Sequence, residues 1–302
     1  MSVSPRVDIA FKKIFGVEEN KDLLISLINS ITQEEDKVSE VTLLNPYNAQ
    51  NFKNDKLSIL DIKAKGLNGK LYNIEIQIVD ETSYDKRALY YWAKLYTEQL
   101  LIGQDYEKLN KAIGIHIVNF TNIADSEKYH NVFHITEKET GERCFKDLEL
   151  HTIELKKFKG QKSEGVSDLL EKIKTALDVW VAFITRHDLL NNIKLPEYLD
   201  DAPLKKALDV LEIMKFSQEE RDAYEAHLKW LRMEVSAVKA AEIKAEARGE
   251  EIGVQKGIQI GELRAIEKMA LGMLKKNIDL NLISAITGLS AEQISSLDVA
   301  LI

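Results

Sequence analysis

Two acidic residues, Asp61 and Glu75, stand inside neighbouring apolar segments of the chain, where they could bind a metal ion. A Gly-Leu-Asn-Gly turn at 66–69 separates the segments, so they predict a β-hairpin. Side chains alternate between the two faces of a strand, so Asp61 shares a face with Lys63, and Glu75 shares one with Gln77. Carboxylates among apolar residues cost free energy unless they are paired, and a divalent cation is a natural partner.

Acids at the ends of a hairpin commonly face water, so the two acids alone do not distinguish a metal site from a solvated turn. The residues around the hairpin favour a site. Gln77 can orient a nucleophile beside Glu75. A helix predicted over 83–103 follows directly, and it carries Arg87, Tyr91 and Lys94. Such side chains hold phosphate groups of nucleic acids. Gln77 and these helix residues therefore favour a site over a solvated turn.

The apolar periodicity predicts an α/β core with a mixed central sheet flanked by helices. A first helix over 7–31 is split at Gly16, and Gly103 ends the helix that begins at 83. The predicted strands cover 38–47, the two arms of the hairpin, 112–120, 129–136 and 148–158.

After Gly165 the pattern is helical only, with helices over 166–186, 204–216 and 218–248. Ser217 and Glu220 predict a capping box for the last of these. We therefore expect an α/β domain at 1–160, a helical region at 161–248, and a tail at 249–302.

The tail has two unusual features. Gly249, Gly253, Gly257 and Gly261 recur every four residues, which fits either a close helix–helix contact or a weakly specified linker. Two short helices around Gly288 have the outline of a helix-turn-helix, but the second lacks Arg and Lys, which favours a packing or dimerisation module.

Composition narrows the class of protein further. The chain has 302 residues, is 45% hydrophobic and carries a net charge of -8, so a nucleic-acid role needs a local basic surface. The single cysteine, Cys144, excludes a disulfide framework. The chain has neither an apolar signal core nor eighteen consecutive apolar residues, so we expect a cytoplasmic protein without a membrane partner.

The histidines give a weaker signal. His116, in the apolar run 112–120, is typical of a hydrogen-bonded core histidine. His130 and His134 are expected to share a strand edge, and two histidines alone are a weak metal signal.

Several ordered motifs resemble one known family, the Rpn recombination-promoting nucleases and transposases of the PD-(D/E)xK nuclease superfamily. The resemblance is carried by five segments: Asp8-Ile9-Ala10-Phe11-Lys12-Lys13-Ile14-Phe15-Gly16, Glu19-Asn20-Lys21-Asp22-Leu23-Leu24, Ser58-Ile59-Leu60-Asp61-Ile62-Lys63, Asn73-Ile74-Glu75-Ile76-Gln77, and Arg87-Ala88-Leu89-Tyr90-Tyr91-Trp92. It covers about the first 120 residues closely and the glycine-rich tail loosely.

The resemblance implies a restriction-endonuclease-like core and DNA endonuclease activity dependent on Mg²⁺ or a similar ion. Asp61 and Glu75 would bind the metal, with the carbonyl of Ile76 as a third ligand. Gln77 stands where the superfamily has lysine. Lys63 would then supply positive charge, as strand alternation suggests, and Asp8 matches the family's early acid, which would either reach the metal through water or cap the first helix.

Three alternatives stay open at this point. The chain could be a nucleic-acid-binding protein with a degenerate nuclease site, because glutamine is neither a cation nor a proton carrier at neutral pH. It could be a toxin or defence effector regulated by its tail. It could also be a non-enzymatic scaffold that forms homo-oligomers through its C-terminal helices.

Overall fold

The structure is a computed structural model that describes residues 3–45, 62–80, 83–158, 165–190, 195–196, 202–212 and 217–297. The chain divides into two compact units, residues 1–232 and 233–302. Asp61 and the predicted strand residues 46–47 lie outside the described residues.

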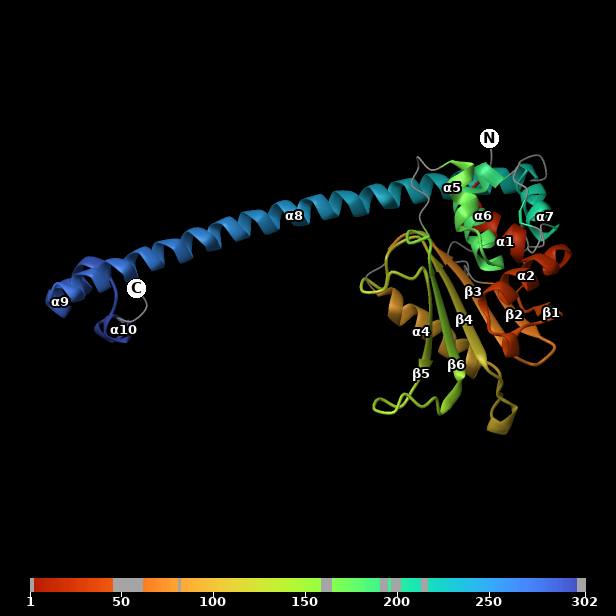
Figure 1. Cartoon of the computed structure of the whole chain (residues 1–302), viewed down its shortest axis with the longest axis horizontal. Helices are drawn as coiled ribbons and strands as arrows, with labels where there is room; N and C mark the ends of the chain where they lie inside the picture. Colours follow the sequence, from red (N-terminus) through yellow and green to blue (C-terminus); the bar gives the residue numbers. More distant parts are fainter. Residues whose placement is uncertain are drawn as a thin grey trace. The chain divides into compact units, whose positions relative to one another are not determined.

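Within the described residues of the first unit, six strands form one mixed sheet in the order β1-β2-β3-β4-β6-β5 (Figure 1). The strand β3 pairs parallel with β4, and β4 pairs parallel with β6, while the other pairs are antiparallel. The bounds of the strands are Val41–Leu43 (β1), Ile62–Gly66 (β2), Leu71–Gln77 (β3), Ala112–Val118 (β4), His130–Ile135 (β5) and Phe145–Glu154 (β6).

The central strands β3 and β4 are buried along their whole length. Parallel strands covered on both faces consist of near-continuous apolar runs, which is the pattern that predicted a central strand over 112–120. The helix α4 (Tyr84–Thr97) contacts β3 and β4 on one face, where Trp92 Nε1 donates a hydrogen bond to the carbonyl of Ala112 at 2.8 Å.

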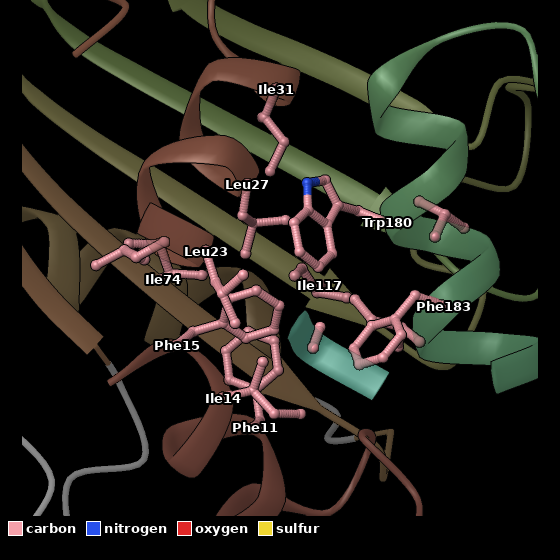
Figure 2. Close-up of a cluster of buried hydrophobic side chains, with 14 of the residues drawn as sticks. Phe11, Ile14, Phe15, Leu23, Leu27, Ile31, Ile74, Ile117, Trp180 and Phe183 are labelled. Atoms are coloured by element: carbon pink, nitrogen blue, oxygen red, sulfur yellow. The ribbon is translucent and has the colours of Figure 1, made fainter. Parts of the chain in front are cut away.

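The opposite face of the sheet carries the main hydrophobic core. Figure 2 shows Phe15, Leu27 and Trp180 meeting the sheet residues Ile74 and Ile117. The ring centroids of Phe15 and Trp180 are 5.2 Å apart in an edge-to-face contact, the arrangement that aromatic pairs prefer. The helices of this layer are α1 (Asp8–Phe15), α2 (Lys21–Ile31), α5 (Val166–Lys172), α6 (Ala176–Leu190) and α7 (Ala202–Leu211), with short 3₁₀ turns at Glu18–Asn20 (η1) and Glu34–Asp36 (η2).

The architecture confirms the predicted α/β fold with a mixed sheet and flanking helices. It also confirms the break at Gly16, whose N–H donates to the carbonyl of Lys12 at the end of α1. The hairpin is confirmed over its described residues, since Lys63 pairs with Asn73 and Gly69 adopts a positive φ of 81° in the turn.

Two of the predicted helices differ from the expectation: one ends earlier, and the other is divided into two helices. The helix predicted over 83–103 ends at Thr97, and Gly103 instead forms a separate turn in which Gln104 N donates to Leu101 O at 3.1 Å. The single helix predicted over 166–186 is two helices. Its break is stabilised by Asp178, whose carboxylate accepts hydrogen bonds from the backbone N–H groups of Lys174 and Thr175 and so caps α6.

The helix α8 (Gln218–Lys275) begins with the predicted capping box. Ser217 N donates to Glu220 Oε2 at 2.8 Å, and Glu220 N donates to Ser217 Oγ at 3.2 Å. The helix was expected to end at 248, but it continues through all four glycines between 249 and 261.

The second unit ends with the two short helices that the sequence predicts. These are α9 (Leu280–Thr287) and α10 (Ala291–Ser296), joined through Gly288 with a positive φ of 74°. Ile283 and Ile294 pack with Ala270 of α8 in a small hydrophobic cluster. The described part of the tail therefore contains a small packed helical module.

None of the described helices combines the length and the apolar character that crossing a bilayer requires.

Candidate active site

The candidate site lies on the face of the sheet that α4 covers. Glu75, in the middle of β3, is fully buried, with 0% of its surface exposed. Arg87, on the first turns of α4, forms an ion pair with Glu75 through its Nη2 atom and Glu75 Oε1. The same Nη2 atom donates to Gln77 Oε1 at 3.3 Å. Strand alternation therefore brings Glu75 and Gln77 together as predicted, and α4 adds Arg87 to them.

The carboxylate of Glu75 is held in its ionised form. Burial alone would raise the pKa of the Glu75 carboxyl, but the neighbouring His116 and the Arg87 guanidinium outweigh burial and lower this pKa below its ordinary value. Glu75 Oε1 is the oxygen that faces Arg87, while Glu75 Oε2 has no hydrogen-bond partner among the described residues. A negatively charged oxygen is thus available inside the protein.

Gln77 is buried as well, and its amide has defined contacts. Its Nε2 donates to the carbonyl of Val79 at 3.1 Å, while its Oε1 accepts from Arg87. Ile76, between the two polar residues, turns its side chain into the main core on the other face of the sheet.

The helix α4 carries the residues predicted to bind substrate. The Arg87 guanidinium carbon lies 5.7 Å from the centre of the Tyr91 ring, within the range of a cation–π contact. Lys94 is exposed and its Nζ lies 3.6 Å from Glu98 Oε1. Arg87 and Tyr91 are therefore adjacent at the site, while Lys94 lies further along the helix.

Lys63 and Asp8 have partners of their own. Lys63 Nζ lies 3.3 Å from Glu98 Oε2, so Glu98 is bracketed by Lys63 and Lys94. Asp8 is buried at the start of α1, and its Oδ2 lies 3.8 Å from Lys12 Nζ. An acid in the first turn of a helix also interacts favourably with the helix dipole.

Two residues of the site were missed by sequence reasoning, His116 and Asn73. His116 is the register partner of Glu75 on β4, and its Nδ1 lies 3.7 Å from Glu75 Oε2. Asn73 is buried on β3 two residues before Glu75. Both are single polar residues at alternating positions in apolar strands, which is the signal that would have found them.

A second polar cluster lies on the opposite face of the sheet and centres on Glu149, which is 0% exposed. Its carboxylate contacts Lys111 Nζ at 3.0 Å, His134 Nε2 at 2.7 Å and His151 Nε2 at 2.9 Å. Hydrogen bonds from these groups, set against burial, hold the pKa of the Glu149 carboxyl well below its usual range.

His130 extends this cluster, because its Nε2 lies 2.9 Å from His151 Nδ1. Burial, followed by the charge of His151, lowers the pKa of His130 to about 4, so this imidazole is neutral at pH 7. His130 and His134 do share an edge strand, as predicted. Their partners are another histidine and an ion-paired carboxylate. In the part of the chain that the structure describes, no group of three or more His, Cys, Asp or Glu side chains is arranged to hold a metal ion.

Comparison with known proteins gives one match. Residues 5–241 match the model of the PD-(D/E)XK nuclease family transposases. No curated protein and no solved structure matches the chain.

Proposed function

The chain belongs to the PD-(D/E)XK nuclease family transposases, and from that premise we propose that it is a metal-dependent DNA endonuclease. One observation carries the proposal: Glu75 is wholly buried, its pKa is lowered, and its Oε2 has no hydrogen-bond partner among the described residues. An unpaired buried carboxylate oxygen costs free energy, and it is a ligand type that divalent cations prefer.

Asp61 is the second carboxylate of the proposed site. It directly precedes Ile62, the first described residue of β2, and the register partner of Ile62 is Ile74, which directly precedes Glu75. We assign Asp61 and Glu75 as metal ligands, with the backbone carbonyl of Ile76 as a third. A divalent cation such as Mg²⁺, held by these residues, would lower the pKa of a coordinated water and would stabilise negative charge on the phosphate.

The other residues orient the reacting groups. Gln77, held by Val79 and Arg87, is placed to accept a hydrogen bond from the attacking water or to donate one to it. Arg87 and Tyr91, together with Lys94 further along α4, bind the phosphate backbone of DNA. Lys63, in β2, adds positive charge to the site. Asp8, the first residue of α1, supports the site as a further acid.

We propose that the substrate is DNA and that the cleavage has low sequence specificity. The net charge of -8 disfavours broad electrostatic capture of DNA. Among the described helices, α10 lacks Arg and Lys, so it does not resemble a base-reading helix. The activity fits recombination, transposition or defence against mobile elements.

Incubation of the purified full chain with supercoiled plasmid tests this proposal. We expect nicked and linear DNA in the presence of Mg²⁺ or Mn²⁺, no product when EDTA removes the metal, and recovery when excess metal is restored. Plasmid that is shifted on a gel but never cut would contradict the proposal. That result would favour the alternative of a nucleic-acid-binding protein with a degenerate site, to which Gln77 points.

We also propose that two copies of the chain associate through α8. Ile243, Val254 and Ile258 are exposed, and their spacings of eleven and four residues place them on one face of the helix. Gly257 and Gly261 lie beside them, with no neighbouring atom within 4 Å of the position of an added Cβ. Small residues between apolar ones allow a second helix to approach closely.

The double substitution Val254→Glu with Ile258→Glu is expected to abolish this association, because it would bury two charges in an apolar contact. Light scattering of the full chain should show the mass fall to that of one chain, 34.4 kDa. The matched control is Ile252→Glu with Leu263→Glu. These two residues are exposed on the opposite face of α8, so the control should keep the mass of the wild-type protein. A wild-type mass of one chain would contradict the proposal.

A further inference from the structure

Three neighbouring buried side chains on the α4 face of the sheet leave polar atoms without partners among the described residues. The unpaired atoms are both amide atoms of Asn73, Oε2 of Glu75 and both ring nitrogens of His116. These residues are 1%, 0% and 2% exposed. An unpaired buried polar group destabilises the fold, and such groups are rare in folded proteins. Three of them together indicate a site that is completed by a ligand.

The register of the parallel pair β3–β4 brings the three side chains to one place. Glu75 pairs with His116, and Asn73 pairs with Gly114. Because Gly114 lacks a side chain, the His116 ring occupies the space above it. A Cβ added to Gly114 would lie 3.0 Å from His116 Nε2. The imidazole thus leans along β4 from the level of Glu75 towards the level of Asn73.

The imidazole is also held in orientation. The Tyr84 ring packs edge-to-face against it, with ring centroids 5.8 Å apart. His116 Nδ1 lies 3.7 Å from Glu75 Oε2, which is too long for a hydrogen bond. Two ligands about 2.1 Å from one cation at angles of roughly 110–120° are about 3.4–3.6 Å apart. The separation of these two atoms therefore suits shared coordination better than mutual hydrogen bonding.

We propose that His116 Nδ1 is a nitrogen ligand of the same divalent cation that Glu75 binds, with the amide oxygen of Asn73 as a neighbouring oxygen donor. This inference rests on the proposed metal site and names the class of metal. An imidazole ligand suits Zn²⁺, Fe²⁺, Ni²⁺ or Cu²⁺, whereas Mg²⁺ is bound mainly through oxygen ligands. The site should therefore prefer a transition metal to Mg²⁺.

Pulsed electron paramagnetic resonance of the Mn²⁺-loaded full chain tests the ligand directly. We expect coupling of Mn²⁺ to an imidazole ¹⁴N nucleus in the wild-type protein and its loss in His116→Phe, which preserves a ring against Tyr84. Calorimetric titration should show Mn²⁺ affinity fall by at least about 10-fold, since even indirect partners of a metal site are worth 10–100-fold. His116→Asn, which keeps a polar side chain, should lose the nitrogen coupling while changing Mg²⁺ affinity less than Mn²⁺ affinity.

The matched control is His134→Asn, which removes an imidazole that contacts Glu149 on the other face of the sheet. It should leave the nitrogen coupling and the Mn²⁺ affinity unchanged. If the wild-type protein cleaves plasmid with bound Mn²⁺ but shows no nitrogen coupling, the ligand assignment is wrong and the nuclease proposal stands. Nitrogen coupling that depends on His116 without any DNA cleavage would support the ligand assignment and contradict the nuclease proposal.

Discussion

Replacing Glu75 with glutamine is expected to lower metal-dependent DNA cleavage by at least about 10²-fold. Replacing a residue that only supports a metal ligand lowers metal affinity or activity by about 10–100-fold. Replacing a carboxylate that binds the metal directly should lower the activity by at least the upper value of that range. Glutamine has nearly the same shape and keeps an oxygen that can accept from Arg87, but it lacks the charge that binds the cation. Initial rates of plasmid nicking at saturating Mg²⁺ and Mn²⁺ measure the effect.

The matched control is Glu98→Gln, which removes a charge from an exposed carboxylate beside Lys63 and Lys94. It should cleave at close to the wild-type rate, or faster if the two lysines bind phosphate more readily without Glu98. Asp61→Ala should behave like Glu75→Gln, because both carboxylates are assigned to one cation. Cleavage by Glu75→Gln at the wild-type rate would show that the reaction does not use this carboxylate.

Replacing Glu149 with glutamine is expected to lower the free energy of unfolding by about 3–5 kcal/mol, the cost of removing one partner from a buried ion pair. The carboxylate is ionised, since its pKa is held well below the usual range, and it accepts contacts from Lys111, His134 and His151. A neutral amide at this position would leave the charge of Lys111 only partly compensated. Urea unfolding, followed by the fluorescence of Trp180 in the core of the same unit, measures the change.

The control for this prediction is Glu107→Gln, a change at an exposed carboxylate on the short helix η3 (Tyr106–Lys108). Its midpoint in urea should stay within error of the wild-type value. The double variant Lys111→Met with Glu149→Gln should be less destabilised than the sum of the two single variants, because the charges are then removed together. An unchanged midpoint for Glu149→Gln would mean that the cluster contributes nothing to stability.

The sequence by itself determined the local elements and one half of the site. Period-two and period-3.6 apolar patterns predicted the hairpin, the buried strand β4 and the helices around Gly16, because burial of one face selects these spacings. The same alternation placed Glu75 and Gln77 on one face and set Arg87 on the following helix. The capping box of Ser217 and Glu220 was readable because its hydrogen bonds join residues three apart in the sequence.

Only the tertiary structure decided which residues of different strands meet. His116 appeared to be an ordinary core histidine until the parallel pairing of β3 with β4 placed it opposite Glu75. Periodicity tells which face a side chain takes, but the register of parallel strands is set by the packing of the connection between them, here α4 on the sheet. The Glu149 cluster likewise depends on contacts between separate elements, for which the linear pattern carries no signal.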